Sequence, residues 1–236
     1  MSDPAISACV SAARRAVGDD GQTQAIIRTV ARRGFTFCAT VEVDQPSTSR
    51  PLSALPPRSQ FIQNHEQKSL AYALAGSGPP ILFTTFGWTS IEADWSSPFF
   101  RPLFDAICAQ NTLLRFDQIG SGHSDRDMGS VSVAALANDT LRAADAAGFD
   151  RFAVFSQSGP AISTVYLTAH HSDRVKAMVL NGGYAEGRNL RPDSSGTQEM
   201  FGVISEAWDR PNSSFLLAYS LLHFPEGPLD LAKDIV

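Results

Sequence analysis

This 236-residue chain has few cysteines and no long apolar run, and both features narrow the class of protein to which it can belong. The three cysteines, Cys9, Cys38 and Cys108, are scattered and odd in number, which argues against a disulfide framework and against a cysteine-based metal site. No apolar run approaches the roughly 20 residues that cross a bilayer, and the N-terminus shows no secretory signal pattern. A Walker phosphate loop and a dinucleotide fingerprint are also missing. These absences predict a cytoplasmic protein that holds no metal and no other cofactor.

Apolar residues make up 43% of the chain, which is enough to build a core in at least its larger part. The segment Asp44–Gln60 instead carries four prolines together with several serines, a composition typical of an extended interdomain linker. This linker separates residues 1–43 from residues 61–236. We therefore predict two domains of unequal size.

The most informative segment runs from Asp150 to Pro160 and reads DRFAVFSQSGP. A short apolar run leads into a turn of small residues, and a helical pattern follows at once. This layout indicates a nucleophile elbow, in which a serine sits on a tight strand-to-helix turn with its hydroxyl exposed. Ser158 suits the central position because Ser156 is small and Pro160 is preset for a helix start. Ser156 is the alternative nucleophile, although branched Val154 would then flank it. The simpler alternative is a turn in which either serine caps the helix.

The segments around this turn alternate between strand and helix patterns. Strands are predicted over Pro80–Phe86, Asn111–Phe116, Phe152–Phe155 and Val175–Leu180, and helices over Ser132–Ala147 and Gly159–His170. Strands that alternate with helices favour a parallel sheet with crossover helices, which is the α/β class.

Taken in order, these segments resemble the first two-thirds of an α/β-hydrolase domain. The resemblance covers residues 61–236 and includes the GPP strand start, the FGW turn, the loop DQIGSGHSD, the elbow and the segment HHSDRVKAMVL. It implies that Ser158 is the nucleophile and that the Gly159 backbone N–H forms half of an oxyanion hole. The N–H of Gly87 or Trp88 would supply the other half. Losing one such donor typically lowers the rate about a hundred- to a thousandfold.

Several features of that family are missing where they are expected. The histidine that often precedes the oxyanion glycine is Phe86 here, and Asn181 stands where some relatives carry the catalytic acid. Residues 187–236 resemble the start of a helical cap, with helices expected over Gln198–Trp208 and Ser213–Leu222. None of the five histidines stands in the position of the catalytic base; they are His65, His123, His170, His171 and His223. Because a serine without a base is a poor nucleophile, the sequence predicts impaired hydrolysis.

The N-terminal segment has a pattern of its own. Asp3 and Pro4 are typical of a helix start, and Gly18 is typical of a helix stop. A second short helix is expected around Gln22–Val30. The segment Ile27–Phe37 then runs into an alternating strand, and Val41 and Val43 continue its register.

This segment resembles the second half of the winged-helix DNA-binding domain of two-component response regulators. The matching residues are AISACVSAARRAVGDDG and IIRTVARRGFTF. The resemblance implies that the first helix is the recognition helix and that RTVARRGF forms the wing hairpin. The side chains that would face DNA are Ser7, Ser11, Arg14 and Arg15 on the helix and Arg32 and Arg33 on the wing. Arginine suits this task because it pairs with phosphates and with guanine edges. The family's leading strands and first two helices have no counterpart in the sequence.

We therefore predict an α/β fold consisting of an incomplete α/β-hydrolase-like parallel sheet with the start of a helical cap, preceded by a partial winged-helix segment. The leading hypothesis is a DNA-binding transcriptional regulator whose hydrolase-like half, with impaired catalysis, is a sensor or interaction module. Its expected partners are DNA, a small-molecule ligand and a second copy of the chain. One alternative is a serine hydrolase of the esterase class that acts on a small ester. The other is a fragment of a longer product in which neither activity is intact.

Overall fold

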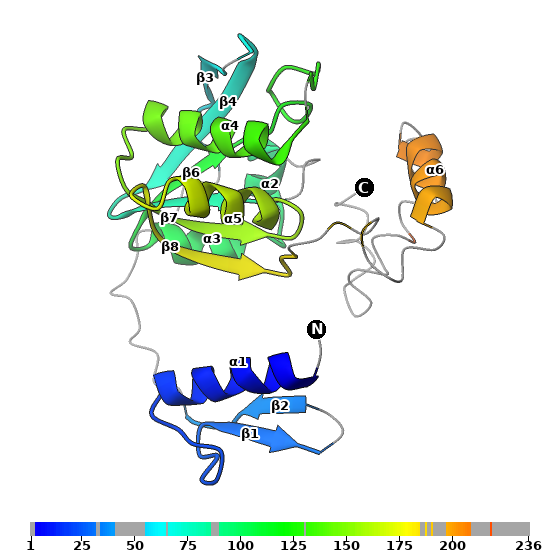
Figure 1. The fold of residues 1–236 in the computed structure, drawn as a ribbon. Helices are drawn as coiled ribbons and strands as arrows, with labels where there is room; N and C mark the ends of the chain where they lie inside the picture. Colours follow the sequence, from blue (N-terminus) through cyan, green and yellow to red (C-terminus); the bar gives the residue numbers. More distant parts are fainter. Residues whose placement is uncertain are drawn as a thin grey trace. The chain divides into compact units, whose positions relative to one another are not determined.

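The structure, a computed structural model, divides the chain into two compact units, residues 1–47 and 48–236 (Figure 1). It describes residues 3–31, 34–40, 55–64, 66–85, 90–129, 131–184, 187, 190, 197–208 and 218. Most of the predicted linker lies outside these ranges, so its two boundaries stay predictions. Within the described ranges, no helix is both long enough and apolar enough to span a membrane.

In its described residues, the first unit contains one helix and one hairpin (Figure 1). Helix α1 covers Asp3–Ala16, and Gly18 follows it with a φ of 70°, which confirms the predicted start and stop of this helix. Strands β1 (Ile27–Val30) and β2 (Gly34–Phe37) then pair antiparallel. The hairpin expected from RTVARRGF is therefore present, whereas the winged-helix relationship itself stays a prediction.

The short helix expected around residues 22–30 is not formed, and the physical reason is a turn held by two carboxylates. Asp20 accepts hydrogen bonds from the backbone N–H groups of Gln22 and Thr23. The Asp19 carboxylate accepts hydrogen bonds from the backbone N–H groups of Ala25, Ile26 and Ile27, the last of which is the first residue of β1. Side-chain acceptors thus take the amides that a helix would need for its own ladder.

The second unit is built on a sheet whose strand order is β3-β4-β6-β5-β7-β8. Four of its strands are parallel neighbours: β6 (Thr112–Phe116), β5 (Pro80–Thr84), β7 (Phe152–Gln157) and β8 (Val175–Asn181). This confirms the mostly parallel α/β sheet. An antiparallel hairpin of β3 (Gln60–Gln63) and β4 (Ser69–Gly76) joins the sheet along β6, and this hairpin was not predicted from the sequence.

Helices cover both faces of this sheet (Figure 1). Helices α4 (Val133–Ala146) and α5 (Ala161–His170) pack on one face. Helices α2 (Ile91–Ser96) and α3 (Arg101–Cys108) pack on the other. The predicted helices over residues 132–147 and 159–170 are confirmed as α4 and α5. Helix α6 (Thr197–Trp208) confirms the helix predicted over residues 198–208, while its place in a cap stays a prediction. The second helix, predicted over residues 213–222, falls almost wholly outside the described residues.

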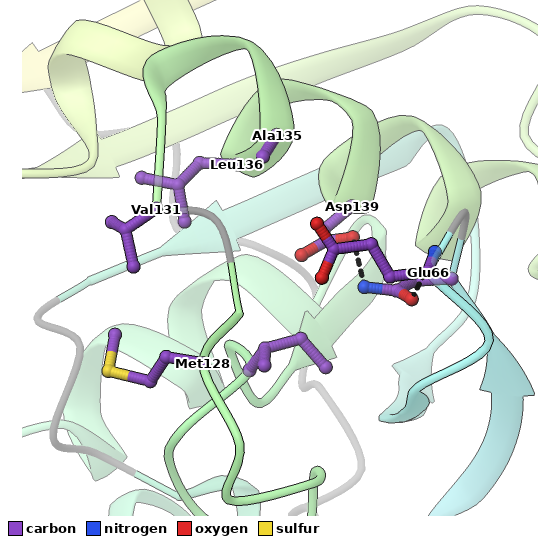
Figure 2. A pocket seen from close by; sticks show the side chains of 8 residues that line it. Glu66, Met128, Val131, Ala135, Leu136 and Asp139 are labelled. Carbon is purple, nitrogen blue, oxygen red and sulfur yellow. Dashed lines mark hydrogen bonds between the residues drawn. The ribbon is translucent and has the colours of Figure 1, made fainter.

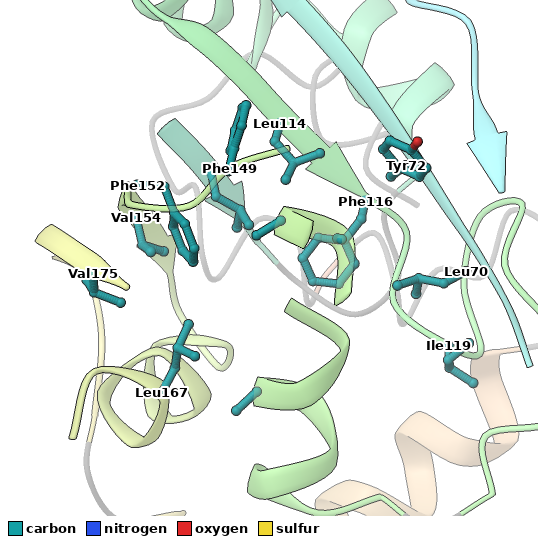
Figure 3. Packing of buried hydrophobic residues seen from close by; sticks show 14 residues of the cluster. Leu70, Tyr72, Leu114, Phe116, Ile119, Phe149, Phe152, Val154, Leu167 and Val175 are labelled. Carbon is teal, nitrogen blue, oxygen red and sulfur yellow. The ribbon is translucent and has the colours of Figure 1, made fainter. Parts of the chain in front are cut away.

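Alternation along the strands divides the core into two layers. Leu82 and Leu114 point into the layer under α4 and α5, which Figure 3 shows. Their neighbours Phe83 and Leu113 point into the opposite layer, against α2 and α3. Successive strand side chains face opposite sides of a sheet, so each of these strands contributes to both layers. Full burial of one such side chain stabilises the fold by about 1.5–3 kcal/mol.

Candidate active site

The turn after β7 places Ser158 between a buried strand and a helix. Ser158 has a φ of 61°, in the left-handed region that residues with a Cβ seldom occupy. Its N–H donates to the carbonyl oxygen of Asn181 at 2.8 Å, and its own carbonyl accepts from the N–H of Ala161 at 3.1 Å. The turn is thus tied to the end of β8 on one side and to the start of α5 on the other. This is the backbone geometry that a nucleophile elbow requires.

The two candidate serines lie in different surroundings. Ser156 belongs to β7, is fully buried and shares a 2.7 Å hydrogen bond with the hydroxyl of Thr84 on β5. Ser158 lies two residues further on, past the end of the strand, and is partly exposed. Ser158 is thus the more accessible of the two serines, while the Ser156 hydroxyl joins two strands.

Gly159, the first predicted oxyanion donor, follows Ser158 directly. Its N–H finds no hydrogen-bond acceptor among the described residues. A Cβ at this position would lie 3.4 Å from the hydroxyl oxygen of Tyr184, which is an ordinary van der Waals contact. The other predicted donors, Gly87 and Trp88, lie outside the described residues, between Thr85 and Ser90.

The described histidines lie outside the turn that carries Ser158. His123 follows β6, is half-exposed, and its Nε2 lies 3.6 Å from Glu92. His170 ends α5, where its ring stacks on Tyr166 and its Nδ1 lies 2.9 Å from the Tyr166 carbonyl oxygen. Neither these two nor His171 forms a hydrogen bond with Ser158 in the described part of the chain. His65 and His223 lie outside it.

One small cavity lies between the start of α4 and the segments that follow β3 and β6 (Figure 2). Its lining combines the apolar side chains of Met128, Val131 and Leu136 with the buried carboxylate of Asp139. Asp139 accepts a hydrogen bond from Asn64, drawn as a dashed line in Figure 2. The cavity holds about 20 Å³, which is room for a single water molecule and far too little for a substrate.

The residues predicted to contact DNA are only partly available for that role. Ser7, Ser11 and Arg15 are exposed, whereas Arg32 and Arg33 lie outside the described residues. Arg14 is buried, and its guanidinium donates to the carbonyl oxygen of Ile27 and to the hydroxyl of Thr29. The prediction for Arg14 is wrong because this side chain joins α1 to β1 instead of facing solvent.

The mostly parallel sheet, its two helical layers and the turn at Ser158 resemble the architecture of the α/β hydrolases. A solved hydrolase from Pseudomonas aeruginosa PA01 matches with a TM-score of 0.56 at 22% identity, over 74% of this chain and 65% of that one. A thermophilic esterase from Thermogutta terrifontis matches with a TM-score of 0.57 at 19% identity, over 75% and 64% of the two chains. Matches at this level of identity establish a shared fold.

One sequence relative adds to this. The chain is 30% identical over 116 residues to the "Putative carbamate hydrolase RutD" of Azorhizobium caulinodans, which covers 49% of this chain and 42% of RutD. No protein-family model matches the chain. The chain thus spans less than half the length of RutD and just under two thirds of the two solved hydrolases.

The hypothesis of a DNA-binding regulator with a hydrolase-like sensor is wrong. The relatives found by sequence and by structure are hydrolases, which fits the alternative of a serine hydrolase better. The burial of Arg14 also argues against DNA binding, because this arginine was one of the side chains predicted to face DNA.

Proposed function

We propose that Ser158 is the nucleophile of a serine hydrolase that acts on a small ester or a related carbonyl compound such as a carbamate. The observation that carries this proposal is the φ of 61° at Ser158, on the turn between β7 and α5. Such backbone costs on the order of 1–3 kcal/mol for a residue with a Cβ and gathers at functional sites. Gln24 and Gln67 also have positive φ, but neither stands at a strand-to-helix turn.

The neighbouring backbone supports acyl transfer. When the Ser158 oxygen attacks a carbonyl carbon, a C–O bond forms and the carbonyl oxygen becomes an oxyanion. A donor that has no acceptor in the resting protein can stabilise this charge, and the Gly159 N–H meets that condition within the described residues. One such donor contributes about 3–4 kcal/mol of transition-state stabilisation in related chemistry.

The substrate class follows from the chemistry of this step and from the relatives. Esters and carbamates both pass through a tetrahedral intermediate with a single oxyanion. The name of RutD refers to a carbamate and that of the Thermogutta protein to an ester. A serine that forms this intermediate therefore accounts for both classes without a metal or redox cofactor.

The test is covalent labelling with an alkyl fluorophosphonate. The Ser158 oxygen bonds to phosphorus, the P–F bond breaks, fluoride leaves and the hydroxyl proton passes to solvent or a nearby base. We expect one adduct per chain, located on Ser158 by peptide mass spectrometry and absent from Ser158→Ala. Ser156→Ala is the matched control, since it removes the neighbouring hydroxyl and should leave the adduct in place. Labelling that persists in Ser158→Ala would contradict the proposal.

A further inference from the structure

Tyr184 lies beside the turn that carries Ser158, although the chain passes through α5 and β8 between these two residues. A Cβ built on Gly159 would lie 3.4 Å from the Tyr184 hydroxyl oxygen. Among the described residues, no other heavy atom beyond the chain neighbours of Gly159 comes within 4 Å of that point. The N–H of Gly159 is the donor that the proposed function uses for the oxyanion. A phenolic hydroxyl therefore stands next to the residue that supplies this backbone donor.

The segment after β8 is shaped to bring Tyr184 to this place. The N–H of Ser158 donates to the carbonyl oxygen of Asn181, the last residue of β8, at 2.8 Å. Gly182 then turns the chain with a φ of 64°, in the region that favours glycine. A Cβ on Gly183 would lie 2.7 Å from the Cβ of the first residue of α5, so the backbone there packs directly on that helix. Three consecutive residues thus hold the chain against the elbow just before Tyr184.

The other side-chain hydroxyls around the turn are used within the fold. The two between β5 and β7 share a hydrogen bond of 2.7 Å. The two in the first turn of α5 donate to the carbonyl oxygen of Pro160, at 2.8 Å and 3.3 Å. All four belong to buried residues, which are Thr84, Ser156, Ser163 and Thr164. Tyr184, in contrast, is 39% exposed, so its side chain is not enclosed in the core.

A phenolic O–H suits the charge that the reaction develops. When the Ser158 oxygen attacks an ester, the carbonyl oxygen becomes negative, and donors that converge on it lower the barrier. Tyrosine is among the side chains that supply such donors, because its hydroxyl donates one hydrogen bond while the proton stays on the phenol.

We propose that Tyr184 is a catalytic residue of this hydrolase: its hydroxyl donates a hydrogen bond to the carbonyl oxygen of the ester as Ser158 attacks, beside the N–H of Gly159. The inference rests on the proposed function and adds a side-chain donor to it. Loss of one oxyanion donor typically slows a reaction about a hundred- to a thousandfold. We expect a smaller loss here, about tenfold or more, because water can partly replace a half-exposed hydroxyl.

The experiment measures how fast p-nitrophenyl acetate acetylates Ser158 in the full chain. The rate is the first-turnover release of p-nitrophenolate, less the release by Ser158→Ala. Tyr184→Phe removes the hydroxyl and keeps the ring, so the maximal rate should fall about tenfold or more while the half-saturating ester concentration stays within about twofold. Tyr166→Phe is the matched control, because it removes a phenolic hydroxyl further along α5, where the ring stacks on His170. Its rate should stay within about twofold of the wild-type rate.

A second ester distinguishes an oxyanion donor from a structural role. In p-nitrophenyl thionoacetate a sulfur replaces the carbonyl oxygen, and sulfur is a weak hydrogen-bond acceptor. The donor therefore contributes less, and Tyr184→Phe should slow this ester by no more than about threefold. A tyrosine that only shaped the site would slow the two esters equally.

Gly183→Ala tests the hydroxyl without removing it. The added Cβ would lie 2.7 Å from the Cβ of the first residue of α5, so the backbone that carries Tyr184 has to move. We expect slower acetylation of Ser158. Adding Gly183→Ala to Tyr184→Phe should cause little further slowing, because both changes act on the same hydrogen bond. Effects that multiply in the double variant would contradict the role of the hydroxyl.

The outcomes separate this inference from the proposed function. A Tyr184→Phe variant that is slow with the acetate and nearly normal with the thionoacetate supports the role of Tyr184. A wild-type rate in Tyr184→Phe, or equal slowing of both esters, overturns that role while leaving Ser158 as the nucleophile. A wild-type chain that releases p-nitrophenolate no faster than Ser158→Ala overturns the proposed function and the role of Tyr184 with it.

Discussion

Ser158 has a left-handed backbone that glycine would adopt at lower cost. The φ of 61° belongs to a residue with a Cβ, so the fold stabilises a conformation that the side chain opposes. A conflict of this kind between local preference and fold is expected at functional sites. The residue therefore gives a stability test that does not depend on catalysis.

Replacing Ser158 by glycine should stabilise the second unit relative to replacing it by alanine. Both changes remove the hydroxyl, but only glycine relieves the backbone, so we expect a difference of about 1 kcal/mol in the free energy of unfolding. Chemical denaturation of the two variants measures it. An alanine variant as stable as the glycine variant would show that the turn is not strained.

At this scale the sequence identifies some residues and not others. The strand-to-helix turn at Ser158 could be predicted because small neighbours and a following helix form a local pattern. Arg14 could not, since its acceptors Ile27 and Thr29 become neighbours only when the hairpin folds back on α1.

At the scale of elements, the connection between α1 and β1 depends on side-chain acceptors. Hydrogen bonds from backbone N–H groups, that of Ile27 first, hold the pKa of Asp19 below its ordinary value of 3.8. A carboxyl group whose pKa is lower in the folded state stabilises that state above the unfolded pKa. This stabilisation is lost as the pH falls through the folded pKa.

We therefore predict that acidification below about pH 4 loosens the first unit. Amide hydrogen exchange at Ile26 and Ile27, corrected for the intrinsic pH dependence, should lose protection on going from pH 6 to pH 3. Asp19→Asn should exchange about tenfold faster at pH 6 and lose most of the pH dependence.

Asp127→Asn serves as the control for this measurement. The pKa of Asp127 is also lowered, through the N–H of Gly129 and through Lys68, but it lies in the second unit. Exchange at Ile27 should not respond to this substitution. Protection in Asp19→Asn equal to that of the wild type would contradict the role given to Asp19.

The unpredicted hairpin of β3 and β4 shows why elements can be missed. The segment LAYALA within β4 is apolar throughout, and a short apolar run fits a buried strand as well as a helix. This segment is identified as a strand only by its antiparallel pairing with β6, in which Tyr72 lies opposite Phe116. The strands that flank Ser158 were easier to predict because helices separate them and turn residues bound them.

At the scale of the whole molecule, the class of fold was predictable, whereas the leading hypothesis for the function was wrong. Alternating strands and helices predict a parallel sheet, and the structure and its relatives bear this out. DNA binding was predicted from a resemblance of the N-terminal segment to a winged-helix domain, and such a sequence pattern cannot tell a solvated cation from a buried one. Arg14 shows the difference, since it is buried and hydrogen-bonded within its own unit.

The most direct test of the central claim is acetylation of the full chain by p-nitrophenyl acetate. Peptide mass spectrometry should find one acetyl group on Ser158, formed with release of one equivalent of p-nitrophenolate and absent from Ser158→Ala. An acetyl group on other residues alone, or release of p-nitrophenolate by Ser158→Ala as fast as by the wild type, would contradict the claim that this serine is the acyl acceptor of a hydrolase.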